Sequence, residues 1–440
     1  MKNRFTIRAL LAVSVGLGAA CVRAEQNWPQ WRGPAFDGAG DAVNLPQSLA
    51  KENQAWETKL PGDGNGTPVV FGDKIFVSCF EPASAKLLGI CIARTDGHII
   101  WQKEIGSSLQ RNDRNNSASP SAVTDGQSVF FTFATGDIAA FDVEGKPLWQ
   151  RNLQKDYGPF NVQWIYSSTP LLYRGKLYVQ VLHRDVPVHR GVASDKPADS
   201  YLLALDPKTG AEIWRQIRPS PARQESKESY GTPVPLEHAG KSQIILVGGD
   251  IVTGHDAETG KEIWRAGGWN NDRHPDWRLV PSPCPDNADG LAFACAPKGG
   301  PVMAVKDDGT GDVTASGFAW KSDPRASGIS SDVCVPLLYK GSLYVLNGDR
   351  KMLFCLDPKT GSEKWKGELG GNQVFRASPT AADGKIYCIN ESGDGCVVSA
   401  EPFKVLSRFS LGGNPSRASI VPLDGLLLVR SGQTLYAFKK

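Results

Sequence analysis

The chain has 440 residues, 40% of them hydrophobic, with 49 basic and 46 acidic side chains. Residues 1–24 carry four of the basic residues and none of the acidic ones, so the remainder has a net charge of −1. This balance argues against bulk electrostatic binding to nucleic acid or to an anionic membrane. After residue 24, no run approaches the roughly 18 apolar residues of a membrane-spanning helix.

The N-terminus is typical of an export signal. A basic stretch, MKNRFTIR, precedes the short apolar core ALLAVSVGLGAA, and Ala24 offers a small residue for cleavage. We therefore predict a signal peptide over residues 1–24 and a protein that is exported, to the periplasm or beyond it. Lipid anchoring through Cys21 is the less favoured alternative, because Gly18 stands where a lipoprotein box prefers Leu.

After an N-terminal extension over residues 25–52, one kind of unit recurs along the chain. Each unit opens on a small residue and usually a proline, then continues with a short apolar strand, a glycine turn and an alternating strand, as in STPLLYRGKLYVQV. A third strand follows, and a fourth strand ends each unit at a Trp. Four short strands per unit, with almost no helical periodicity, predict a propeller blade.

Eight such units can be counted. Their starts lie near residues 66, 117, 167, 231, 279, 331, 376 and 416, and the eighth has only three strands before the chain ends. Residues 53–60 supply a matching fourth strand, since Trp56 precedes Leu60 as Trp365 precedes Leu369. We therefore predict an all-β single domain over residues 53–440. It is an eight-bladed β-propeller of four-stranded antiparallel blades, with the last blade closed by the N-terminal strand.

The motif LDPKTGAEIW, which ends at Trp214, returns as LDPKTGSEKW, which ends at Trp365. Asp206 can accept backbone N–H groups of its own turn, and Gly210 can adopt the positive φ that the reversal needs. A Trp on the outer strand can bury its ring against the neighbouring blade. We predict a structural role for the motif residues, which are Asp206, Gly210, Asp357, Gly361, Trp56, Trp101, Trp149, Trp214, Trp264, Trp320 and Trp365. Ser407 stands where an eighth Trp is expected.

Eight cysteines follow the predicted signal peptide. An even number in an exported protein suggests disulfides, and three pairs flank predicted reversals: Cys79–Cys91, Cys284–Cys295 and Cys388–Cys396. The alternative is that these residues are small buried hydrophobes, because cross-strand disulfides are geometrically demanding. No close CxxC pair is present, so we predict no metal site.

The stretch ALDPKTGAEIW from Ala204 to Trp214 reads A-x-D-x-x-T-G-x-x-x-W without a mismatch. It resembles the tryptophan-docking repeat of quinoprotein-type, PQQ-like β-propellers. Residues 53–440 resemble the PQQ-binding-like propeller group that includes the BamB proteins, and NWPQWRGPAFDGAG at 27–40 is similar to the leader region of its secreted envelope members. The resemblance implies the propeller fold and leaves activity open, because the group contains both redox enzymes and non-catalytic scaffolds.

For the redox enzymes of that group, the resemblance implies a quinone in the central funnel between a Trp floor and a vicinal disulfide. It also implies calcium held by acidic and amide side chains, with an Asp as base. This sequence has no adjacent Cys pair and no CxxCH haem motif. A PQQ-dependent oxidoreductase with calcium is therefore the alternative hypothesis, and we assign no catalytic residue.

Residues just before the innermost strand of each blade line one mouth of a propeller channel. Aligning the units on their starts places amide, aromatic and charged side chains there. The predicted channel-mouth residues are Asn65, Asn116, Trp164, Tyr166, Tyr230, Arg278, Asp332, Arg376 and Arg417. Arginines that face one funnel can hold an anion. Alternatively, they pair with Glu228, Asp332 and Asp63 and only fill a solvated channel.

These patterns favour a monomeric, non-catalytic binding or protein-interaction scaffold in the bacterial cell envelope or periplasm. The expected partners are envelope proteins or a small anionic ligand, and no nucleic acid.

Overall fold

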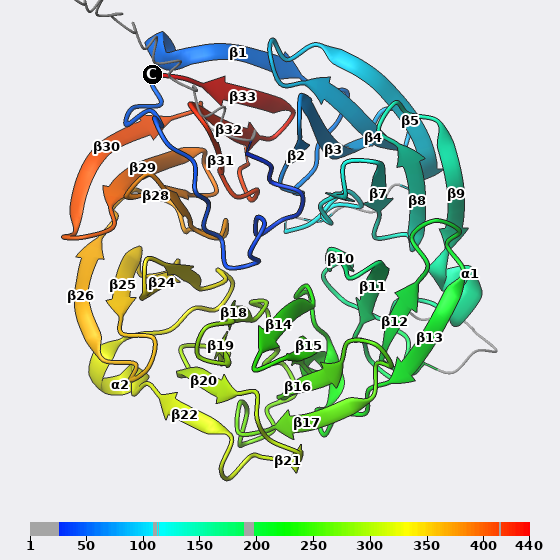
Figure 1. Ribbon diagram of the computed structural model, residues 1–440, viewed down its shortest axis with the longest axis vertical. Helices are drawn as coiled ribbons and strands as arrows, with labels where there is room; N and C mark the ends of the chain where they lie inside the picture. Colours follow the sequence, from blue (N-terminus) through cyan, green and yellow to red (C-terminus); the bar gives the residue numbers. More distant parts are fainter. Residues whose placement is uncertain (1–25, 109–111, 113, 189–197, 413–414) are drawn as a thin grey trace, which may run out of the picture.

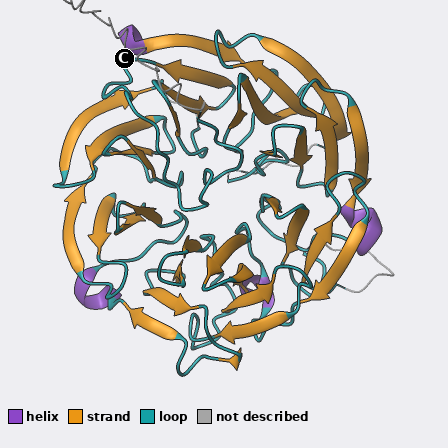
Figure 2. Cartoon of the chain, viewed as in Figure 1, coloured by secondary structure: helices purple, strands orange, loops and turns teal. Residues whose placement is uncertain are grey.

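Eight antiparallel sheets stand around a common axis and form a ring (Figure 1). The computed structural model describes residues 26–108, 112, 114–188, 198–412 and 415–440. The predicted signal peptide over 1–24, with Cys21, lies outside these residues. Strands and loops make up nearly the whole ring, as Figure 2 shows. This confirms the prediction of an all-β, eight-bladed propeller.

Each blade contributes four strands, numbered from the channel outward. Blades 1–4 consist of β2 (Val69–Phe71), β3 (Lys74–Glu81), β4 (Lys86–Ala93) and β5 (Ile99–Ser107); β6 (Val123–Thr124), β7 (Ser128–Thr132), β8 (Asp137–Asp142) and β9 (Pro147–Asn152); β10 (Leu171–Tyr173), β11 (Lys176–Val181), β12 (Tyr201–Leu205) and β13 (Glu212–Ile217); and β14 (Val234–His238), β15 (Lys241–Gly248), β16 (Ile251–Asp256) and β17 (Glu262–Ala266).

The second half of the ring repeats this order. Blades 5–7 consist of β18 (Cys284–Asp286), β19 (Leu291–Cys295), β20 (Val302–Lys306) and β22 (Phe318–Lys321); β23 (Leu337–Tyr339), β24 (Ser342–Asn347), β25 (Met352–Leu356) and β26 (Glu363–Glu368); and β27 (Thr380–Ala382), β28 (Lys385–Ile389), β29 (Asp394–Ser399) and β30 (Lys404–Ser410). The helical pieces are short: η1 (Lys51–Asn53), α1 (Leu153–Tyr157), η2 (Gln224–Lys227) and α2 (Pro324–Ser327). None of the helices in the described chain has the length and apolarity of a membrane span.

Blade 8 joins the two ends of the chain. Its strands β31 (Val421–Leu423), β32 (Leu426–Ser431) and β33 (Thr434–Phe438) come from the C-terminus, and β1 (Gln54–Lys59) pairs antiparallel with β33 on the outside. The prediction that an N-terminal strand closes the last blade is therefore confirmed. The pairing with β1 satisfies backbone N–H and C=O groups of β33 that the three C-terminal strands would leave unpaired. It also closes the ring by joining both ends of the chain in one blade.

The hydrophobic core lies between neighbouring blades. One cluster joins buried side chains of blades 8 and 1, for example Leu428 and Ile75, and similar clusters follow around the ring. Inner strands such as β11 are buried along their whole length, whereas the outer strand β13 alternates between exposed and half-buried residues. This gradient follows from position, since inner strands are covered on both faces and outer strands on one.

The motif residues dock one blade onto the next. The Oδ1 atom of Asp206 accepts the N–H groups of Lys208 (2.7 Å) and Thr209 (3.1 Å), and Gly210 has a φ of 71°. Trp149, from the preceding blade, donates its Nε1–H to the carbonyl of Pro207 at 2.8 Å. The structural role predicted for the motif is therefore visible as a contact between blades.

Four other motif tryptophans repeat this contact. Their Nε1–H groups donate to backbone carbonyls of the next blade: Trp56 to Arg94, Trp101 to Val143, Trp214 to Glu258 and Trp320 to Pro358. Trp264 and Trp365 differ. Trp264 is fully buried and donates to Gln243 Oε1 of its own blade at 2.7 Å. Trp365 packs against the Phe403 ring, 5.2 Å between centroids.

The exception at Trp264 has a local cause. Between β20 and β22, the chain of blade 5 makes a longer excursion in place of the tight motif turn, and within it β21 (Gly311–Asp312) pairs parallel with the outer edge of β17. Blade 5 therefore offers no motif carbonyl to the indole N–H of Trp264, which donates instead to Gln243 of its own blade. Ser407 lies opposite Val397, the register position of the motif Trp, and its hydroxyl donates to the carbonyl of Gln47.

The N-terminal extension crosses the middle of the ring before it reaches β1 (Figure 1). We call residues 26–50 the strap. Trp28 forms a bridge with Val70 of blade 1, and Ala39 forms one with Ala381 of blade 7. Val43 donates its N–H to the Asp424 carboxylate at 2.9 Å. Thr124 of blade 2 and Leu338 of blade 6 also donate their N–H groups to strap carbonyls, so the strap ties blades on different sides of the channel to one another.

All eight described cysteines are buried free thiols, and two of the three predicted disulfides are wrong. In the β3–β4 hairpin, Cys79 lies opposite Leu88 and Cys91 opposite Phe76; the two thiols belong to cores on opposite faces of blade 1. Cys284 lies opposite Phe293, two residues from Cys295. Such a diagonal pair is about 7–8 Å apart, too far for a disulfide.

Cys388 and Cys396 do face each other in the β28–β29 register. Their disulfide stays a prediction, because an oxidising compartment favours its formation. Titration of thiols in the unfolded chain cleaved after Ala24, which lacks Cys21, is expected to find two fewer before reduction than the eight present after it. Replacing Cys388 by serine should leave the other six thiols unchanged and remove that difference. Equal counts before and after reduction of the unaltered chain would contradict the prediction.

Candidate functional site

The two faces of the ring carry different loops. Because the strands of a blade are antiparallel, the segment that enters the first strand and the loop between the second and third strands lie on the same face. A cavity of about 450 Å³ opens there, within the range of small-molecule sites. Its lining residues are Trp31, Asn65, Arg114, Asn115, Ser119, Ser121, Trp164, Ser167, Thr169, Glu225, Tyr230, Asp276, Arg278, Val280, Lys298, Asp332, Val333, Arg376, Ser378, Glu391 and Arg417.

The structure brings most of the predicted channel-mouth residues together. Seven of the nine line the cavity: Asn65, Trp164, Tyr230, Arg278, Asp332, Arg376 and Arg417. Asn116 and Tyr166 do not, which corrects their predicted placement. The Asn116 side chain caps its own turn by accepting the Ala118 N–H at 2.9 Å. Tyr166 is buried between strands and donates its hydroxyl to the carbonyl of Gln180 at 2.7 Å.

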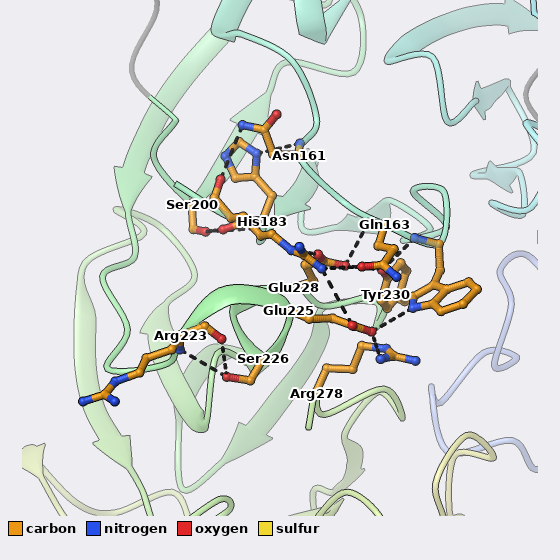
Figure 3. Close-up of polar contacts among 12 residues, drawn as sticks. Asn161, Gln163, His183, Ser200, Arg223, Glu225, Ser226, Glu228, Tyr230 and Arg278 are labelled. Carbon is orange, nitrogen blue, oxygen red and sulfur yellow. Dashed lines mark hydrogen bonds and ion pairs between the residues drawn. The ribbon is translucent and has the colours of Figure 1, made fainter. Parts of the chain in front are cut away.

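One wall of the cavity is built on a turn of 3₁₀ helix, η2, which presents Glu225. The Glu225 Oε1 atom accepts the Trp164 Nε1–H at 2.8 Å and also forms an ion pair with Arg278. Figure 3 shows Arg278 reaching this carboxylate. The guanidinium carbon of Arg278 lies 5.6 Å from the Trp164 ring centroid and 5.9 Å from that of Tyr230, close enough for cation–π attraction.

A second carboxylate, Glu228, lies next to the first (Figure 3). It is fully buried and accepts hydrogen bonds from the Arg184 guanidinium, the Tyr230 hydroxyl and the Gln163 N–H. Burial raises the pKa of Glu228, and these three donors partly oppose the shift. Burial and then the Glu228 charge raise the pKa of the Tyr230 phenol well above its usual range. Glu228 therefore acts as the structural anchor of this wall.

The rest of the cavity lining carries three more cations, each with a carboxylate. Arg417 pairs with Glu391 (2.8 Å), Arg376 with Asp349 (3.0 Å) and Lys298 with Asp332 (3.1 Å). Burial favours the neutral form of Asp332, but the Lys298 N–H and ammonium outweigh it and lower the pKa of Asp332.

The pairing expected from the sequence is therefore corrected. The cavity arginines Arg278, Arg376 and Arg417 do pair with carboxylates, but with Glu225, Asp349 and Glu391 rather than with Glu228, Asp332 and Asp63. Asp63 instead forms a backbone bridge with Phe80.

Arg114 lies over the Trp164 ring at 5.1 Å, on a turn capped by Asn112. Unlike the other four cations of the lining, it has no carboxylate partner among the described residues. Sequence reasoning missed Arg114, although it stands only two positions before the predicted Asn116. It also missed Glu391, which belongs to the loop between the second and third strands, and Trp31, which the strap carries.

The donor set does not fit calcium beside a quinone. Calcium requires six to eight oxygen ligands, yet Glu225, Asp332 and Glu391 each already bind a cationic side chain. Among the described residues, no group of three or more His, Cys, Asp or Glu is placed to hold a metal ion. The cavity is better suited to an anion, because guanidinium groups bind planar oxyanions in two-point contacts.

Comparison with known proteins shows the family to which the chain belongs. The sequence pattern of the family described as outer membrane protein assembly factor BamB matches residues 49–181, 198–315 and 312–404. The chain belongs to this BamB family. Its propeller superposes on BamB from Moraxella catarrhalis with a TM-score of 0.60 and 14% identity, over 88% of this chain and 99% of that one.

Redox enzymes share the BamB-like fold as well. A europium-containing methanol dehydrogenase superposes with a TM-score of 0.68 and 13% identity, over 92% of this chain and 90% of that one. A polyvinylalcohol dehydrogenase of Sphingopyxis sp. (strain 113P3) is 24% identical over 404 residues, which is 85% of this chain and 55% of the relative. The chain thus spans about half the length of the curated relatives it matches. These likenesses confirm the PQQ-like propeller and leave the activity undecided.

Proposed function

We propose that this chain is a non-catalytic, monomeric binding scaffold of the bacterial cell envelope or periplasm, and that its channel mouth holds a small anionic ligand. The observation that carries the proposal is a cavity lining with five cations, four of which each pair with a carboxylate. A held guanidinium is preorganised, so little side-chain entropy is lost when a ligand binds.

Arg278 keeps a donor for a ligand. A guanidinium has five N–H groups, and a contact with one carboxylate uses one or two of them. The Nε–H of Arg278 is a buried donor with no partner among the described atoms. Arg114 adds a cation that no described carboxylate neutralises, and Trp164 and Tyr230 offer aromatic surface beside it. A ligand with a carboxylate or phosphate group and a flat or apolar body matches this lining.

Calorimetric titration with citrate and with inorganic phosphate tests the proposal. Binding of at least one probe is expected, weakening with salt because the contact is ionic. Replacing Arg376 and Arg417 together by glutamine should weaken it at least about tenfold, the loss of roughly 1.4 kcal/mol of contact. Unfolding temperature should change little, because both side chains are partly exposed. The control is Arg174→Gln, which removes an exposed ion pair with Glu237 away from this cavity. Failure of both probes to bind would reject the ligand.

The second candidate is a PQQ-dependent oxidoreductase, favoured by the similarity to a polyvinylalcohol dehydrogenase over most of the chain. Three of the four carboxylates in the cavity lining argue against it, since Glu225, Asp332 and Glu391 each pair with a cation. Spectral titration of the protein with PQQ and calcium separates the two candidates. Tight binding together with dye-linked oxidation of an alcohol would overturn the scaffold proposal.

A further inference from the structure

The floor of the cavity does not belong to the propeller. Every lining residue lies within the blades and their connecting loops except Trp31, which comes from the strap. Its neighbours hold it from both sides: Trp28 is fully buried and donates its Nε1–H to the carbonyl of Trp31 at 3.2 Å, and Arg32 is almost fully buried. Trp31 itself is only half-buried, so part of its side chain is available to a ligand.

Arg32 connects the strap to the wall above it. Its guanidinium donates to the carbonyl of Pro379 at 2.9 Å and to that of Pro336 at 3.2 Å. These prolines stand at the entries of blades 7 and 6, three or four residues after Arg376 and Asp332. Arg32 therefore fastens the strap to the two short segments that present one cation and one carboxylate to the cavity.

The strap is attached by few regular contacts. Two isolated bridges, at Trp28 and Ala39, and single backbone hydrogen bonds such as that from Thr124 to Pro29 hold it to the sheets, whereas every blade has a continuous ladder. Elements with few regular backbone hydrogen bonds open at a lower free energy than the core of a protein. Opening of the strap would expose Trp28, which packs in the core between blades 8 and 1, and would remove Trp31 from the cavity, while the ladders within the blades would stay paired.

From this geometry we propose that the strap is a detachable floor of the binding site, and that strap docking and ligand binding are coupled through Trp31 and Arg32. The inference rests on the proposed ligand site. A ligand in contact with both Trp31 and the arginine wall binds the docked state better than the open one, so it stabilises docking, and a strap that is open part of the time weakens binding in proportion to the fraction docked.

Hydrogen exchange of the full protein, with and without citrate or phosphate, tests the coupling. In the unaltered protein, whichever probe binds should slow exchange of peptides from residues 26–50 about threefold or more. Trp31→Ala should abolish this protection and weaken probe binding about tenfold. Arg32→Met should speed strap exchange even without a probe, while the blade strands exchange as before. The control is Pro34→Ala, an exposed strap position outside the cavity, which should change neither quantity.

The outcomes separate the two proposals. If a probe binds Trp31→Ala and Arg32→Met as tightly as it binds the unaltered protein, the coupling is overturned and the ligand site stands. If neither probe binds the unaltered protein, the ligand site fails and the coupling fails with it. If Arg32→Met does not fold, Trp31→Ala still decides, because its half-buried side chain can be removed without exposing the buried part of the strap.

Discussion

Replacing Gly210 by alanine is expected to lower the free energy of unfolding by about 2–4 kcal/mol. Two effects add. Gly210 has a φ of 71°, a left-handed conformation that costs alanine about 1 kcal/mol or more. An added Cβ would also lie 2.6 Å from the Trp149 ring, which is docked on this turn from the preceding blade. The ring must move, and overpacking of this kind costs about 1–3 kcal/mol.

Gly175→Ala is the matched control for this experiment. Gly175 has a φ of 70°, almost the same as Gly210, but an added Cβ there meets nothing within 4 Å. Gly175→Ala should therefore lower the free energy of unfolding only through backbone strain, by about 1 kcal/mol. Urea unfolding of both variants measures the difference, which isolates the contribution of blade docking. Equal losses in the two variants would mean that the Trp149 contact adds nothing to stability.

Trp264→Ala is expected to destabilise the ring by about 3–5 kcal/mol, the usual range for a fully buried Trp. Its indole fills the core between blades 4 and 5 and donates to Gln243 Oε1. Truncation leaves a cavity in that core and removes the donor from a buried acceptor, and each loss is costly. Because the neighbouring clusters are separate, we expect the effect to be largest on exchange in blades 4 and 5.

Trp214→Ala is the control at the same motif position one blade earlier. Trp214 is only half-buried, and its N–H donates to a carbonyl near the surface, Glu258, which water can satisfy after truncation. A loss of about 1–3 kcal/mol is expected. A Trp264 variant no less stable than the Trp214 variant would show that the inward hydrogen bond and burial do not matter.

The propeller was predictable because its signals are local and repeated. A turn such as Asp206 to Gly210 is specified by an acceptor side chain and a positive-φ glycine within five residues, and the chain repeats it with variations. Ring closure was also predictable, since a blade with three strands at one end implied a strand at the other. The different hydrogen bond of Trp264 could not be predicted, because it depends on whether blade 5 offers a backbone carbonyl to the indole N–H.

The cysteines show where local patterns mislead. Symmetry about a turn predicted three facing pairs, but only Cys388 and Cys396 lie opposite each other. A shift of one residue moves a side chain to the other face of a strand. Spacing alone does not determine this register. In the register that forms, Cys79 and Cys91 lie on opposite faces of blade 1, in separate cores.

The sequence by itself determined the blade, the number of blades and most of the positions that face the channel mouth, because each follows from short-range patterns that recur from blade to blade. Only the tertiary structure decided which residues pair as ions in the cavity and that Trp31 forms the cavity floor. Arg417 meets Glu391 and Arg278 meets Glu225 between the loops of neighbouring blades, and Trp31 reaches the cavity only because the strap crosses the ring. Such contacts depend on how eight blades close around one axis, which no single repeat encodes.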